Sequence, residues 1–129
     1  MILGGDLGGT KTLLALAESD AGRISIVHQQ RFASADYPTF DALLGEFLVD
    51  RPAVESACFG VAGPTDGDSA KLTYLPWSLA AAELGRRFGI ARVTLANDFA
   101  AAAMSFPLAH EPGGRFAFSA ANSQLLGVI

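Results

Sequence analysis

Residues 5–12 read Gly5-Asp6-Leu7-Gly8-Gly9-Thr10-Lys11-Thr12 and include the end of a short apolar strand, Ile2 to Gly5. A glycine pair allows a tight turn and lets backbone N–H groups approach a bound anion without a Cβ in the way. Thr10 adds a hydroxyl donor, and Asp6, at the strand end, can hold Mg²⁺ directly or through water. The pattern predicts that Gly8, Gly9, Thr10 and Lys11 bind phosphate and that Asp6 binds the metal ion.

Two better-known glycine motifs do not fit this stretch. Gly4 and Gly9 have the spacing of a P-loop, but Thr10 stands where that loop requires a lysine. The dinucleotide-binding fingerprint, Gly-x-Gly-x-x-Gly, is also absent. An ordinary hairpin with a Gly-Gly turn is the alternative interpretation. The acidic strand end, together with Thr10-Lys11-Thr12, favours a phosphate-binding turn.

The composition is that of a globular domain and excludes several classes of partner. The chain has 129 residues, of which 50% are hydrophobic and 17% are charged. A net charge of -4 argues against a nucleic-acid partner, which would need a basic face. The apolar stretches are too short or too interrupted to span a bilayer, and Met1 does not open a signal peptide. We therefore expect a cytoplasmic protein, in which the single cysteine, Cys58, is a small core residue.

Turn residues and hydrophobic periodicity predict an α/β domain. Three strands joined by glycine turns should form an antiparallel meander, and strands alternating with helices should follow it. The expected strands are Ile2–Gly5, Thr12–Ala17, Arg23–Phe32, Val54–Ala62 and Arg92–Ala96. One helix should cover about residues 40–48, capped by Thr39 or Asp41, and another should run from Ser78 to Phe88 and end at Gly89. A mixed sheet results.

Asn97 and Asp98 follow the last of these strands and open an Ala-rich helix that Pro107 ends. The carboxyl end of a strand in an α/β sheet is where ligands gather. Asp98 has a simpler explanation as a helix-capping residue, and by itself capping is the stronger interpretation.

Taken in order, these motifs resemble the N-terminal domain of the bacterial glucokinase family, within the actin-like, ribonuclease-H-like superfamily of sugar kinases. The resemblance covers about residues 1–110. It rests on four segments: Asp6 to Thr12, Gly60-Val61-Ala62-Gly63-Pro64, the segment ending at Trp77, and Asn97-Asp98-Phe99. It implies that residues 111–129 are a linker and the truncated start of a second domain.

The resemblance also implies a function, the phosphorylation of glucose or a related hexose by ATP with Mg²⁺. Asp98 would be the general base that accepts the proton of the sugar's 6-hydroxyl, and Asn97 would hydrogen-bond to sugar hydroxyls. The full-length protein would be a homodimer. The family's remaining sugar and ATP ligands belong to the second domain, so this chain alone should be inactive.

Tyr74 departs from the family pattern, which usually has asparagine at this position. The departure leaves the identity of the hexose open. Two other functions are compatible with the motifs: another hexose kinase of the related repressor and kinase group, or a non-catalytic sugar-sensing protein on the same fold. The presence of both Asp6 and Asp98 argues against a sensor, which needs neither a metal-binding acid nor a base.

Overall fold

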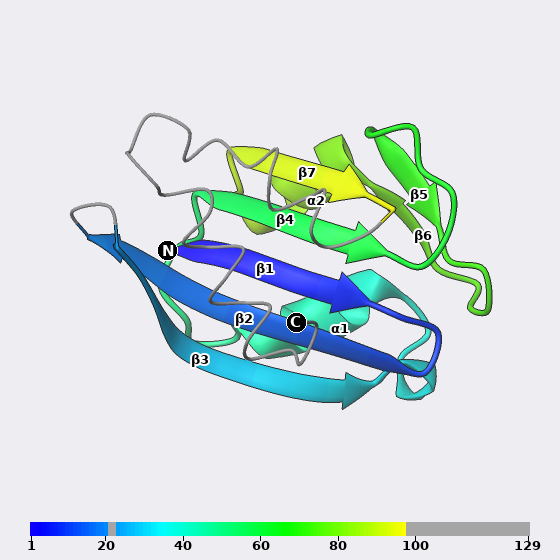
Figure 1. Ribbon diagram of the computed structural model, residues 1–129, viewed down its shortest axis with the longest axis horizontal. Helices are drawn as coiled ribbons and strands as arrows, with labels where there is room; N and C mark the ends of the chain where they lie inside the picture. The colour runs from blue at the N-terminus through cyan, green and yellow to red at the C-terminus, as the bar shows by residue number, and fades with distance from the viewer. Residues whose placement is uncertain (21–22, 98–129) are drawn as a thin grey trace.

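A five-stranded mixed sheet, in the order β3-β2-β1-β4-β7, forms the centre of the computed structural model, which describes residues 1–20 and 23–97 (Figure 1). The strands are β1 (Ile2–Leu7), β2 (Lys11–Asp20), β3 (Arg23–Ala33), β4 (Ser56–Val61) and β7 (Arg92–Ala96). β1, β2 and β3 are antiparallel neighbours, while β4 and β7 run parallel to β1. The predicted meander followed by parallel strand–helix units is confirmed.

β4 is the buried centre of the parallel part. Ala57, Cys58, Phe59 and Val61 are all buried, as a strand covered on both faces requires. Burial raises the pKa of the Cys58 thiol above its ordinary value, so the thiolate is disfavoured. Cys58 is therefore a core residue, as predicted.

Helix α1 (Phe40–Leu48) begins where the sequence indicates. The Thr39 hydroxyl accepts a hydrogen bond from the Ala42 N–H at 3.1 Å, so Thr39, and not Asp41, is the capping residue. The helix buries an apolar stripe at helical spacing, Phe40, Leu43, Leu44 and Phe47. These side chains share one core with Leu3, Leu7 and Phe59 of the sheet, and both helices lie on this face of the sheet (Figure 1).

Helix α2 (Ala81–Phe88) begins three residues later than the sequence predicts, which corrects the expected start at Ser78. Residues Ser78–Ala80 instead form a short strand, β6, which pairs antiparallel with β5 (Ser69–Lys71). Leu79 is buried between the exposed Ser78 and the half-buried Ala80, an alternation that suits a strand and not the first turn of a helix. The predicted end is confirmed, because Gly89 adopts the left-handed conformation with φ 68°.

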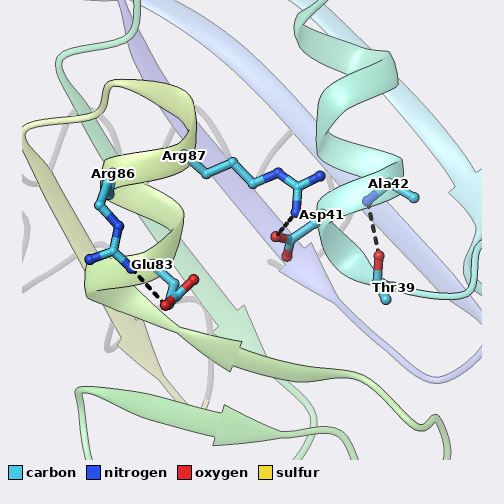
Figure 2. A network of polar contacts seen from close by, with 6 residues as sticks. All are labelled: Thr39, Asp41, Ala42, Glu83, Arg86 and Arg87. Atoms are coloured by element: carbon cyan, nitrogen blue, oxygen red, sulfur yellow. Dashed lines mark hydrogen bonds and ion pairs between the residues drawn. The ribbon is translucent and has the colours of Figure 1, made fainter.

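The two helices contact each other across the back of the sheet (Figure 2). Arg87 of α2 donates to the Asp41 carboxylate of α1 at 3.0 Å, and Arg86 pairs with Glu83 within α2 at 2.6 Å. Exposed ion pairs of this kind contribute little stability, about 0–1 kcal/mol each. Apolar burial therefore determines how the helices pack on the sheet. None of the helices in the described ranges is long and apolar enough to cross a membrane.

Candidate functional site

Three parallel strands end at the same edge of the sheet and bring the predicted site residues together there. The register pairs Asp6 of β1 with Gly60 of β4, and Gly60 with Ala96 of β7. Asn97 is exposed and comes directly after Ala96. The sheet thus brings Asp6 and Asn97 to the same edge. Asp98, the helix expected to end at Pro107, and residues 111–129 lie outside the described residues.

The glycine turn joins β1 to β2 at this same edge. The Gly8 N–H donates to the Lys11 carbonyl at 2.9 Å and closes the hairpin, with Gly9 and Thr10 at its tip. Among the described residues, neither glycine of this turn has a positive φ. The need for glycine is steric instead. A Cβ on Gly9 would lie 3.0 Å from Cβ of Tyr74, and one on Gly8 would lie 3.0 Å from the Lys11 carbonyl oxygen.

The turn is held from inside the protein by Ser34, at the start of a 3-10 turn after β3 (Ser34–Asp36). The Ser34 N–H donates to the Thr10 carbonyl at 3.0 Å, and its hydroxyl donates to the Gly8 carbonyl at 2.8 Å. The hydroxyl of Thr12 lies 2.9 Å from the Ser34 oxygen. Sequence reasoning missed Ser34, because a serine after a strand carries no signal that it will fold back onto residues so distant in the chain.

Asp6 is half-buried, and this burial raises the pKa of its carboxyl group. Its neighbour on β4, Gly60, places no side chain beside it. Within residues 1–20 and 23–97, no three His, Cys, Asp or Glu side chains gather into a metal cluster. A single carboxylate that shares a cation with phosphate oxygens and water is typical of Mg²⁺ and does not require such a cluster. The donor set therefore fits Mg²⁺ brought in with a nucleotide.

Trp77 and Tyr74 come from one loop but have different environments. Trp77 is 1% exposed, its indole N–H donates to the Tyr37 carbonyl at 3.1 Å, and its ring lies 5.8 Å from that of Phe40. Trp77 is therefore a core residue that fixes the loop against α1. Tyr74 is 82% exposed and lies beside Gly9. Of the two aromatic residues, Tyr74 is the one available to a ligand at this edge.

Gly63, in the loop after β4, lies against the backbone of the Lys71–Thr73 segment. The Lys71 N–H donates to the Pro64 carbonyl at 3.3 Å, and the Thr73 N–H donates to the Ala62 carbonyl at 3.0 Å. These hydrogen bonds hold the Tyr74 loop close to the carboxyl edge of the sheet.

Comparison with known proteins identifies relatives of this chain. The model of the Glucokinase family matches residues 3–117. A glucokinase of Nostoc punctiforme is 42% identical over 104 residues, which are 78% of this chain and 30% of that protein. A glucokinase of Psychromonas ingrahamii is 35% identical over 105 residues, which are 81% of this chain and 32% of that protein.

A solved structure shares the fold. The crystal structure of a glucokinase from an Antarctic psychrotroph is 31% identical, with a TM-score of 0.68, over 81% of this chain and 34% of that one. The chain thus spans about a third of the length of the relatives it matches.

Proposed function

Because this chain belongs to the glucokinase family, we propose that it forms the N-terminal domain of an enzyme that transfers the γ-phosphoryl group of ATP to glucose. Residues 1–110 make up this domain, and residues 111–129 form a linker and the start of a second domain. The proposal includes a cytoplasmic homodimer as the full-length enzyme.

One observation carries the proposal, the row formed by Asp6, Gly60 and Ala96 across three parallel strands. The glycine turn, the Asp6 carboxylate and Asn97 all follow or end strands of this row, so they lie at one edge of the sheet. Phosphoryl transfer consists mostly of positioning and charge neutralisation, and these are the parts that it needs.

The glycine turn binds the phosphate groups of ATP. The Gly8 N–H closes the hairpin, so Gly9 and Thr10 provide the backbone N–H groups for phosphate. The exposed side chains of Thr10 and Lys11 add a hydroxyl and a positive charge. Asp6 holds Mg²⁺, which neutralises charge on the phosphates when it is bound. Asp6 and the glycine turn lie at the edge of the sheet where Asn97 follows β7.

Asn97 and Asp98 bind and activate the sugar. The Asn97 amide can both donate to and accept from hydroxyl groups, so it positions the sugar. Asp98 accepts the proton of the attacking 6-hydroxyl, so that a new O–P bond forms as the bond between the γ-phosphorus and the ADP oxygen breaks.

The direct test is a coupled kinase assay of the full-length gene product over a panel of hexoses that includes glucose, mannose, galactose and fructose. We expect ATP-dependent phosphorylation with the highest kcat/KM for glucose, and no turnover by the 129-residue chain assayed in parallel. A preference for another hexose would indicate that the change from asparagine to Tyr74 alters which sugar the enzyme accepts. Absence of phosphorylation for every sugar would contradict the proposal.

Asp6→Asn should have opposite effects on activity and on stability. Burial raises the pKa of the Asp6 carboxyl in the folded state, so the folded state binds this proton more tightly than the unfolded state. The stability that the protonated carboxyl contributes is fully present at pH values below the ordinary pKa of aspartate. It is lost as the pH rises from there through the raised pKa of the folded state. At neutral pH, the ionised Asp6 therefore destabilises the fold, and asparagine relieves this cost.

We expect Asp6→Asn to raise the Tm of the chain at pH 7, with a difference that disappears as the pH falls below about 4. In the full-length enzyme, the same substitution should raise the Mg²⁺ concentration needed for half-maximal activity. The control is Asp68→Asn, a change at an exposed carboxylate directly before β5, in the connection between β4 and β5. An Asp6→Asn variant with unchanged Mg²⁺ dependence would contradict the metal assignment.

A further inference from the structure

Ser34 and Thr12 are buried polar residues with 0% exposure, and both lie behind the glycine turn. A serine hydroxyl carries one hydrogen, and that of Ser34 is donated to the Gly8 carbonyl. The hydrogen shared with Thr12 must therefore come from Thr12. The result is a directed chain from the Thr12 hydroxyl to the Ser34 hydroxyl to the Gly8 carbonyl, in a buried setting where such bonds strengthen one another.

These bonds determine the direction of two peptide planes in the turn. In a trans peptide, the carbonyl of one residue and the N–H of the next point in opposite directions, and the described residues contain no cis peptide. Ser34 binds the carbonyls of Gly8 and Thr10 from the protein side. The N–H groups of Gly9 and Lys11 consequently point away from Ser34.

We propose that Ser34 is a positioning residue for phosphoryl transfer, which holds the turn with the N–H groups of Gly9 and Lys11 directed at the phosphate groups of ATP. This role rests on the proposed function, in which the turn binds ATP. It does not follow from the glycine motif, because a Gly-Gly turn without this clamp could rotate its peptide planes and present carbonyl oxygens to the phosphates instead.

Two variants of the full-length enzyme separate positioning from simple stability. Ser34→Ala leaves the Gly8 carbonyl without its hydrogen bond, while Thr12→Val removes a buried hydrogen bond of the same chain but keeps the contact between Ser34 and Gly8. Both lose stability. We expect Ser34→Ala to raise the KM for ATP about five- to tenfold and to change the KM for glucose less than about twofold. Thr12→Val should change both constants less than about twofold.

Folding is checked by circular dichroism and thermal unfolding, and the kinetics are measured well below the lower of the two melting temperatures. If Ser34→Ala does not fold, Ser34→Cys is used, because a thiol is of similar size but is a weaker donor. Its KM for ATP should be raised about two- to fivefold. An unchanged KM for ATP in the folded Ser34 variant, or an equal rise in Thr12→Val, would overturn the proposal.

The wild-type enzyme distinguishes this outcome from a failure of the proposed function. Wild-type phosphorylation of hexoses together with an unaffected Ser34 variant rejects only the positioning role. A wild type without kinase activity rejects the proposed function, and the positioning role with it.

Discussion

Asp98→Asn in the full-length enzyme should lower kcat about a hundred- to ten-thousandfold and change the KM for glucose less than about threefold. Asparagine has nearly the same shape as aspartate, but its amide cannot accept the proton of the attacking hydroxyl. Sugar contacts should therefore survive while the chemical step is lost. Steady-state kinetics with glucose and ATP, together with calorimetric titration of glucose, measure the two effects separately.

Asn97→Ala provides the matched control for this prediction. The neighbouring amide is proposed to position the sugar and not to take its proton, so its removal should raise the KM for glucose more than it lowers kcat. If Asp98→Asn retained a near-normal kcat, Asp98 would be a helix-capping residue and the base would have to be sought elsewhere.

Gly63→Ala should destabilise the chain by about 4 kcal/mol or more and lower its Tm by about 15 °C or more. A Cβ on Gly63 would lie 2.0 Å from the backbone carbonyl oxygen of Lys71 and 3.2 Å from Cα of Leu72. Backbone atoms cannot rotate away as a side chain can. Hydrogen bonds on both sides of the contact, Lys71 to Pro64 and Thr73 to Ala62, must break before the segments separate.

Gly45→Ala is the control for the same chemical change. Gly45 lies within α1, and its added Cβ would meet Phe88 at 3.8 Å, an ordinary van der Waals distance. Alanine is the better helix former, so this variant should be neutral or up to about 1 kcal/mol more stable. Thermal unfolding of both variants provides the comparison, and similar melting temperatures would show that the Gly63 contact is not as close as described.

Much of the fold could be predicted, because the relevant signals are local. The apolar run around Phe59 indicates a buried strand, Thr39 caps a helix with regular apolar spacing, and Gly89 is a helix-ending glycine. The predicted start of α2 is wrong because it depends on a contact that is not local. Ser78–Ala80 is a strand only because Ser69–Lys71 lies beside it, and no local sequence pattern indicates so short a strand pairing.

In the candidate site, too, features with a local sequence signal could be predicted and contacts between distant segments could not. Asp6, the glycine turn and Asn97 are recognisable from their positions at strand ends, and the structure brings these strand ends to one edge. The clamp by Ser34 and the contact between Gly9 and Tyr74 join segments far apart in the chain. The contact also adds a reason for glycine at position 9 that the sequence does not indicate, since a Cβ there would lie 3.0 Å from Cβ of Tyr74.

The pairing of Asp6 with Gly60 and of Gly60 with Ala96 places these residues at one edge of the sheet and also determines the distance between β1 and β7 there. Asp6 and Ala96 are separated by two strand spacings, which is about 10 Å. Backbone hydrogen bonds between strands maintain this separation, so no loop side chain can alter it. Under the proposed function, substitutions at exposed loop positions such as Tyr74 can change which sugar is accepted while the spacing between Asp6 and Ala96 stays constant.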